Sequence, residues 1–296
     1  MKLFKISPRG FCSGVINAFT IAKNVAINNP NKKIYMIGWL VHNENVVKEI
    51  ESLGITVLDD RKKDRKSLIM EIDPVDEPIV LFSAHGTDKK IIDLAKNRKL
   101  RVIDLTCVYV TQTHDLVREK LDNGYKVLYI GVSNHPETIS SLAISDDIIL
   151  IEKKEDVEKL KIKDEKIFVT NQTTISIYEF YDVIKTLRHL YKNIEFRNDI
   201  CNATTERQDA LINLIKFLDL VIVVGDQRSN NSLKLVDIAK KNHVDAYLVS
   251  NNKELCNNWF KNKMNVGLTS GASTPDYITQ SIIDKIVEWY GPEIIE

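Results

Sequence analysis

A stretch near the middle of the chain, residues 100–107 with the sequence LRVIDLTC, shows the pattern that decides the fold. It is an apolar, strand-like run that ends in polar residues and a cysteine, and a helical pattern follows it. The same pattern leads from residues 3–6 to Cys12 and from residues 194–196 to Cys201, so the three cysteines lie 95 and 94 residues apart. Self-similarity at about a third of the chain length predicts three related structural units.

Each repeat contains two further strand-like runs with polar residues after them. The second run ends in a glycine and a polar loop, and it covers residues 34–38, 127–131 and 221–225. The third run precedes small polar residues, and it covers residues 79–82, 167–169 and 266–268. Apolar residues spaced three and four apart between the strands indicate helices. Apolar strands that alternate with helices predict an α/β fold of parallel sheets, with units at residues 1–99, 100–193 and 194–296.

The composition excludes several classes of protein. The chain has 296 residues, of which 44% are hydrophobic, so a disordered chain is excluded. Lys+Arg and Asp+Glu number 41 each, and the resulting net charge of zero predicts no nucleic acid partner. The apolar runs are far below the roughly 20 residues of a membrane span, and the N-terminus lacks a secretory signal. We therefore expect a soluble, cytoplasmic protein. Four cysteines make a disulfide framework unlikely, so we expect reduced thiols.

Cys12, Cys107 and Cys201 are candidate ligands of a metal centre. A single cysteine between a strand and a helix is usually a small buried hydrophobic residue, but three at matching places of a repeat favour a shared role. The helix dipole favours the thiolate, which is the form that binds metal. A structural zinc site needs four ligands, whereas three thiolates on a four-iron cluster leave one iron open. Cys256 lies outside the repeat, and we expect it to be structural or incidental.

Polar side chains at the other strand ends are candidates for binding an anion, in particular a phosphate. They are His42, His85, His135, Ser229, Asn230, Asn231 and Ser273. Backbone N–H groups and imidazolium rings at helix N-termini favour phosphate, although each residue could equally be a hydrogen-bonded part of its loop. Glu137 could donate a proton if burial raises its pKa, or could simply lie in the first turn of a helix. Thr173 could bind a substrate hydroxyl or cap a helix.

Eight short motifs occur in a fixed order between residue 8 and about residue 276. They are PRGFCSGV (8–15), VHN (41–43), FSAHG (82–86), DLTC (104–107), HPE (135–137), QTT (172–174), ICNATT (200–205) and GAS (271–273). In this order they resemble the LytB/IspH family, the 4-hydroxy-3-methylbut-2-enyl diphosphate reductases, over nearly the whole chain. The resemblance implies a trefoil of three pseudo-threefold related α/β units around a central iron-sulfur site.

The resemblance also implies an activity, the reductive dehydroxylation of 4-hydroxy-3-methylbut-2-enyl diphosphate to isopentenyl and dimethylallyl diphosphate in the non-mevalonate isoprenoid pathway. Cys12, Cys107 and Cys201 would hold a [4Fe-4S] cluster whose open iron binds the substrate hydroxyl and can be lost on isolation to leave [3Fe-4S]. Glu137 matches the proton donor and Thr173 a threonine near the hydroxyl, and His135 is assigned both a catalytic and a binding role. The diphosphate would be held by His42, His85, His135, Ser229, Asn231 and Ser273. A carrier such as ferredoxin or flavodoxin would supply electrons, because no glycine-rich dinucleotide motif is present.

The chain departs from the family pattern at several positions. Val108 stands where members usually have proline after the second cysteine, and residues 140–141 replace a usual Gly-Thr pair. Asn230 replaces one of two paired serines, but its amide can still donate to a phosphate oxygen. Asp226 would place a negative charge close to the phosphate, and this counts against a phosphate site there. Arg228 also replaces a typical residue.

Two other functions fit part of the pattern. A dehydratase of the quinolinate synthase kind also resembles a three-unit fold with three cysteines, but its own motifs are missing here, and binding of a diphosphate would separate the two activities. A non-catalytic iron-sulfur protein that senses redox state is the second alternative. An open iron surrounded by His135, Glu137 and Thr173 favours turnover over sensing.

Overall fold

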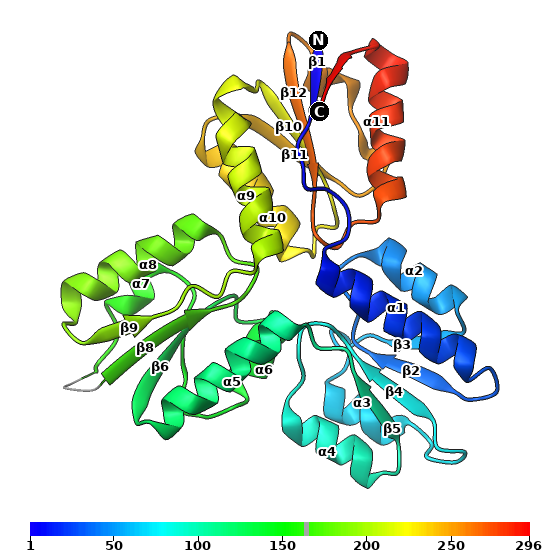
Figure 1. The fold of residues 1–296 in the computed structure, drawn as a ribbon, viewed down its shortest axis with the longest axis vertical. Coiled ribbons are helices and arrows are strands. Elements are labelled where there is room, and N and C mark those ends of the chain that lie inside the picture. Colours follow the sequence, from blue (N-terminus) through cyan, green and yellow to red (C-terminus); the bar gives the residue numbers. More distant parts are fainter. Residues whose placement is uncertain (163–165) are drawn as a thin grey trace. The chain divides into compact units, whose positions relative to one another are not determined.

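The structure is a computed structural model that describes residues 1–162 and 166–296. Its strands form three sheets in which the strand pairs are parallel, with helices between successive strands (Figure 1). The predicted α/β fold of parallel sheets is therefore confirmed. Contacts divide the chain into two compact parts, which we call unit 1 (Met1–Ile16, Val41–Val46 and Cys201–Glu296) and unit 2 (Asn17–Leu40 and Val47–Ile200).

Unit 1 contains the five-stranded sheet A. Its spatial order is β11 (Asp245–Val249), β10 (Leu220–Val224), β12 (Asn265–Ser270), β1 (Lys2–Lys5) and β13 (Glu293–Ile295). The interior strand β10 is buried along its whole length, because helices cover both faces of the sheet. One face carries α11 (Asp276–Tyr290), and the other carries α9 (Asn202–Leu214) and α10 (Asn230–Lys241) (Figure 1). Short 3₁₀ helices follow α9 and β11, at Ile215–Phe217, Asn252–Glu254 and Asn257–Phe260.

Unit 2 contains two four-stranded sheets, of which sheet B comes first in the chain. Its spatial order is β3 (Ile55–Leu58), β2 (Ile34–Ile37), β4 (Ile79–Phe82) and β5 (Arg101–Asp104). α3 (Arg65–Glu71) and α4 (Lys89–Asn97) bury apolar residues against the sheet, and Asp64 and Asp88 cap their first turns. α1 (Ser13–Asn28) and α2 (Glu44–Ser52) begin in unit 1 and continue in unit 2.

Sheet C is the second sheet of unit 2. Its spatial order is β7 (Ile149–Ile151), β6 (Tyr125–Ile130), β8 (Lys166–Asn171) and β9 (Ile194–Phe196). One apolar core joins the sheet to α7 (Lys154–Val157) and α8 (Ile177–Leu190), and a second core joins it to α5 (Val108–Asp122) and α6 (Pro136–Leu142). Ser176 and Glu179 form a capping box that starts α8.

All three sheets share one strand order. In each sheet one strand lies between the two strands that follow it in the chain, so the connections leave it in opposite directions. These strands are β2, between β3 and β4, β6, between β7 and β8, and β10, between β11 and β12. The resulting switch point lies between β2 and β4 in sheet B, between β6 and β8 in sheet C, and between β10 and β12 in sheet A. In open α/β sheets, ligands bind beyond the carboxyl ends of the two strands that flank such a point.

The strand that precedes each repeat cysteine lies beside one of the two strands that flank a switch point. β5 pairs with β4, β9 pairs with β8, and β1 pairs with β12. Each of these strands thus completes the sheet of the neighbouring predicted segment, because it extends the parallel ladder beside the switch point. The boundaries of the segments 1–99, 100–193 and 194–296 stay a prediction. Within the described residues, the helices are too short or too polar to cross a lipid bilayer.

Candidate functional site

The predicted substrate residues follow the strands that flank the switch points. In chain order they are His42 after β2, His85 after β4, His135 and Glu137 after β6, Thr173 after β8, Ser229, Asn230 and Asn231 after β10, and Ser273 after β12. These are the positions at which parallel sheets place ligand-binding side chains. His42, Ser229, Asn230, Asn231 and Ser273 belong to unit 1, and the others belong to unit 2.

Glu137 is a buried carboxyl group that Thr173 holds from both sides. It lies in the first turn of α6, and only 1% of it is exposed. The backbone N–H of Thr173 donates to Oε1 at 2.7 Å, and the Thr173 hydroxyl donates to Oε2 at 2.9 Å. Gln172 accepts from the N–H of Val132 and from the hydroxyl of Thr138, at 3.0 and 3.2 Å. The loops after β6 and β8 are therefore tied together, and this fixes Thr173 beside Glu137.

Burial raises the pKa of Glu137 from its ordinary value of 4.5 to about 7. Desolvation is the largest cause, and it outweighs the hydrogen bonds from Thr173, which stabilise the charged form. Near neutral pH the carboxyl group is therefore partly protonated, so it holds a proton that it can donate. Glu137 was expected to donate a proton only if burial raises its pKa, and burial does raise it.

We expect the Glu137 proton to make stability depend on pH. The folded state binds this proton more tightly, so the contribution to stability is fully present below about pH 4.5 and is lost as the pH rises through about 7. At 1.36 kcal/mol per pKa unit, the loss is about 3 kcal/mol. Glu137→Gln removes the titrating group, so its advantage in free energy of unfolding over the parent should grow by about 3 kcal/mol from pH 4 to pH 8.

Urea unfolding at the two pH values measures this difference. Glu119→Gln, an exposed position on α5, is the matched control and should show no such change. A Glu137→Gln advantage that stays constant with pH would contradict the raised pKa.

His135 and His85 bring two imidazole rings together in unit 2. Their ring centroids are 5.2 Å apart in an edge-to-face arrangement. His135 also caps α6, because its Nδ1 accepts from the backbone N–H of Glu137 at 3.2 Å. A ring nitrogen that accepts a hydrogen bond carries no proton, so the proton of this ring lies on Nε2. His135 can therefore donate to an anion without first becoming charged.

Two serines that depart from the family pattern support α6 beneath Glu137. The hydroxyls of Ser140 and Ser141 lie 3.3 and 3.1 Å from Nε2 of His114 on α5. Both hydroxyls also donate to the carbonyl of Glu137, at 2.9 and 2.8 Å. Burial lowers the pKa of His114 to about 4, so its ring is neutral at physiological pH. His114 is thus a buried side chain that supports α6.

Ser229 and Ser273 come together in unit 1 at the N-terminus of α10. Ser229 is the N-cap residue, and its hydroxyl accepts from the N–H of Ser232 at 3.4 Å. The Ser273 hydroxyl donates to Ser229 Oγ at 3.2 Å. Asn230, the first residue of the helix, is half-buried. A helix N-terminus with clustered hydroxyls suits an anion.

A chain of hydrogen bonds joins the start of α10 to two of the cysteines. The Asn231 amide donates to Thr204 Oγ1 at 2.9 Å, and its Oδ1 accepts from the N–H of Ala272 at 3.2 Å. The Thr204 hydroxyl lies 3.3 Å from the sulfur of Cys201. The Ala272 carbonyl accepts from the N–H of Cys12 at 3.0 Å. The loops that carry Cys12 and Cys201 are therefore part of one hydrogen-bonded assembly with Asn231.

The charge of Asp226 is balanced by Arg228. The Asp226 carboxylate accepts from Nε and Nη2 of Arg228, both at 2.7 Å, and from the N–H of Glu44 at 3.1 Å. Burial raises the pKa of Asp226, but its bonds to Arg228 outweigh burial, and the pKa is lowered. The Arg228 carbonyl lies 2.8 Å from Nδ1 of His42. Because a carbonyl can only accept, Nδ1 carries a proton. Asp226 and Arg228, which both depart from the family pattern, therefore orient His42 together.

The cysteines lie between a strand and a helix, as predicted. Cys12 directly precedes α1, and Cys107 and Cys201 are the N-cap residues of α5 and α9. These cysteines and Cys256 are half-buried, and none forms a disulfide. Cys12 and Cys201 belong to unit 1, and Cys107 belongs to unit 2. Residues 1–162 and 166–296 contain no ready-made group of three His, Cys, Asp or Glu side chains for a metal ion, so the ligand set stays a prediction.

Arg207 on α9 is a buried residue that the sequence patterns do not single out. It is 2% exposed, and its Nη1 and Nη2 donate to the carbonyls of Ala203 and Gly10, both at 2.7 Å. A signal was available, because Thr204, Arg207 and Leu211 are spaced three and four apart on one helix face. A charged residue on a stripe with a buried leucine is unusual and suggests a role.

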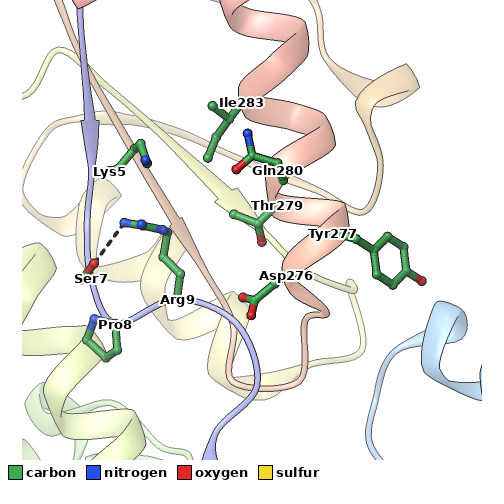
Figure 2. A pocket seen from close by; sticks show the side chains of 9 residues that line it. All are labelled: Lys5, Ser7, Pro8, Arg9, Asp276, Tyr277, Thr279, Gln280 and Ile283. Atoms are coloured by element: carbon green, nitrogen blue, oxygen red, sulfur yellow. Dashed lines mark hydrogen bonds between the residues drawn. The ribbon is translucent and has the colours of Figure 1, made fainter. Parts of the chain in front are cut away.

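A cavity of about 650 Å³ lies between β1, the loop after it and the start of α11 (Figure 2). Arg9 and Lys5 in its wall pair with Glu296, and Arg9 also donates to Ser7. Beside the cavity, Gly10 has φ +74°, and a Cβ there would lie 1.9 Å from Asp276 Oδ1, so this close approach requires glycine. The lining of this cavity contains no predicted site residue, so it is not the predicted substrate site.

Parallel sheets with polar clusters at their switch points define an α/β protein of the ligand-binding kind. More particularly, the chain belongs to the LytB family, whose profile, described as LytB protein, matches residues 3–287. It is 53% identical to the 4-hydroxy-3-methylbut-2-enyl diphosphate reductase of Malacoplasma penetrans over 96% of each chain. It is 40% identical to the reductase of the same name from Anoxybacillus flavithermus, over 98% of this chain and 91% of the relative.

Solved structures show the same likeness. The E-1-hydroxy-2-methyl-but-2-enyl-4-diphosphate reductase from Plasmodium falciparum matches with a TM-score of 0.90 and 32% identity, over 99% of this chain and 90% of that one. A structure of (E)-4-hydroxy-3-methyl-but-2-enyl diphosphate reductase, the terminal enzyme of the non-mevalonate pathway, matches with a TM-score of 0.65 and 28% identity, over 97% and 99% of the two chains. The family resemblance seen in the motifs is confirmed.

Proposed function

We propose that this chain reductively removes the hydroxyl group of 4-hydroxy-3-methylbut-2-enyl diphosphate to form isopentenyl and dimethylallyl diphosphate, the last step of the non-mevalonate isoprenoid pathway. The reaction breaks the allylic C–O bond, forms a C–H bond, consumes two electrons and two protons, and releases water. Family membership and the names of the relatives support this activity. The observation that carries it is Glu137, a buried acid with a pKa of about 7 that Thr173 holds at a switch point.

We assign Cys12, Cys107 and Cys201 as the ligands of a [4Fe-4S] cluster with one open iron. All three precede a helix, where the thiolate is favoured. Arg207 fits an anionic group at this place, because it is a buried cation on which the charges of Cys12 and Cys201 act. When bound, the cluster supplies electrons and a Lewis-acidic iron. Loss of the exposed iron on isolation would leave [3Fe-4S].

Protein side chains supply the proton and fix the point from which it is transferred. The protonated Glu137 carboxyl group provides one of the two protons that the reaction consumes. Thr173 contacts both Glu137 oxygens, so the proton is delivered from a fixed point. Burial keeps water away from this carboxyl group and thereby keeps its pKa near the working pH.

The diphosphate is assigned to the polar side chains that follow the switch-point strands. They are His42, His85, His135, Ser229, Asn230, Asn231 and Ser273. The N-terminus of α10 offers backbone N–H groups beside the Ser229 and Ser273 hydroxyls. His135 donates through Nε2 as a neutral ring, whereas His42 uses Nδ1 for the Arg228 carbonyl and so binds an anion through a protonated Nε2.

Asp226→Asn is expected to raise KM for the substrate about fivefold and to change kcat much less. The substitution breaks the ion pair that holds the Arg228 backbone, which in turn orients His42. A partly buried pair of this kind is worth about 1 kcal/mol, and 1.4 kcal/mol is a factor of ten. Arg228→Lys keeps the charge but loses the two-point contact, and it should raise KM in the same direction. Steady-state kinetics measures both, and a lower KM in Asp226→Asn would show that Asp226 repels the substrate.

An external carrier such as ferredoxin or flavodoxin is the proposed electron donor, and the cytoplasm is the proposed location. Anaerobic purification should give a brown protein with broad absorption in the blue. The proposed function is tested with a reduced low-potential dye: its oxidation should require 4-hydroxy-3-methylbut-2-enyl diphosphate. A cluster whose dye oxidation does not depend on this substrate would instead favour a redox sensor, and turnover restricted to a substrate without diphosphate would favour the quinolinate synthase kind.

A further inference from the structure

Arg207 is a buried arginine that has no carboxylate partner in the part of the chain that the structure describes. It is 2% exposed, and among the described residues it makes no ion pair with Asp or Glu. Nη1 and Nη2 are hydrogen-bonded to carbonyls, while its buried Nε has no hydrogen-bond partner in residues 1–162 and 166–296. A guanidinium removed from water in this way is costly unless negative charge lies close to it, so its surroundings are suited to an anionic group.

Cys12 and Cys201, the two cysteines of unit 1, lie close enough to Arg207 to act on its charge. Burial lowers the pKa of Arg207, and the charges of Cys12 and Cys201 are the largest of the effects that oppose this. Glu206 and Asp276 contribute less. A group bound to the sulfurs of Cys12 and Cys201 would therefore place its negative charge close to Arg207.

Arg207 also links the start of α9, directly after Cys201, to the loop that carries Cys12. Its Nη2 donates to the carbonyl of Gly10, two residues before Cys12. Its Nη1 donates to the carbonyl of Ala203, two residues after Cys201. Ala203 lies in the first turn of α9, the helix that also carries Arg207, so the planar guanidinium ties the start of this helix to the Cys12 loop through two bonds of 2.7 Å, a geometry that a lysine cannot reproduce.

We propose that Arg207 is a positioning residue of the iron-sulfur centre that holds the Cys12 and Cys201 loops in register and favours the reduced cluster through its positive charge. The inference rests on the proposed function, because it needs a cluster on these cysteines. A thiolate-bound cluster is anionic, and reduction adds one more negative charge. Net charge and hydrogen bonding around a cluster set its reduction potential, so a buried cation raises that potential.

Redox titration of the cluster, followed by its electron paramagnetic resonance signal, tests the charge. Arg207→Gln should shift the one-electron equilibrium about tenfold toward the oxidised form, which is a potential about 59 mV lower. Arg207→Lys keeps the charge and should shift the potential by less than half as much. Because Lys loses the two-sided contact, it should release iron to a chelator several-fold faster than the parent does. Arg118→Gln, an exposed arginine on α5, is the control and should change neither property.

The outcomes separate this inference from the proposed function. A parent protein that binds no cluster would defeat the proposed function itself. A parent with a cluster and turnover, but with an unchanged potential in Arg207→Gln, would overturn only the role of Arg207. Should Arg207→Gln fail to fold, the Lys variant decides: a potential close to the parent's combined with faster iron release supports the role, and a full 59 mV decrease, or parent-like iron release, overturns it.

Discussion

Glu137→Gln is expected to lower kcat by about 10² to 10⁴-fold while the protein keeps its cluster and its affinity for substrate. Glutamine occupies nearly the same volume, and its amide oxygen can still accept from the Thr173 N–H while its NH₂ group donates to the Thr173 hydroxyl, but it has no acidic proton to give. The loss should therefore fall on kcat. Anaerobic steady-state kinetics with a reduced dye measures kcat and KM, and visible absorption measures the cluster.

The pH profile of the parent gives an independent reading of the same group. Glu137 must be protonated to act as the donor, and its pKa is raised to about 7, so kcat should fall as the pH rises above about 7. In Glu137→Gln the small residual activity should no longer show this decrease. Glu119→Gln should keep the parent's rate and profile. A Glu137→Gln variant with full turnover would remove Glu137 from its role as donor.

Replacement of any one of the three repeat cysteines by serine is expected to abolish turnover and to remove most of the bound iron. Cys12→Ser, Cys107→Ser and Cys201→Ser each leave two thiolates for a cluster that would otherwise have three. Loss of one ligand weakens every remaining bond, so three equally severe effects are the signature of one shared centre. Iron and sulfide content per chain, together with visible absorption, measures the loss.

Cys256→Ser provides the matched control. Cys256 is half-buried like the other three but lies outside the repeat, before a 3₁₀ helix of unit 1. It should keep the parent's iron content and turnover. If Cys107→Ser keeps a full cluster while Cys12→Ser and Cys201→Ser lose it, the shared ligand set is wrong.

Most of the fold could be predicted because its determinants are local. Apolar runs such as residues 221–224 can be buried on both faces only in a parallel sheet, and the helical spacing between runs requires crossovers. The repeat of cysteine, glycine and polar loop placed each candidate residue at a strand end. Sequence alone did not show that β1, β5 and β9 extend the sheet of the neighbouring segment, because strand pairing depends on contacts distant in sequence.

The residue types of the candidate site could be predicted better than the burial, hydrogen bonds and ion pairs of these residues. His135, Glu137 and Thr173 were found from their positions, yet the raised pKa of Glu137 arises from burial, which only the packed structure shows. Asp226 counted against a phosphate site because its partner Arg228 could not be assigned from the sequence. Arg207 was not predicted as a site residue, because an arginine on a helix is ordinarily exposed.

The most direct test of the proposed activity is the stoichiometry of one anaerobic reaction. The protein is mixed with 4-hydroxy-3-methylbut-2-enyl diphosphate and a one-electron viologen dye in its reduced form, and both the oxidised dye and the five-carbon diphosphates are counted. We expect two dye molecules oxidised for each molecule of product, and isopentenyl and dimethylallyl diphosphate as the products. Dye oxidation without substrate, or a product that keeps its hydroxyl group, would contradict reductive dehydroxylation.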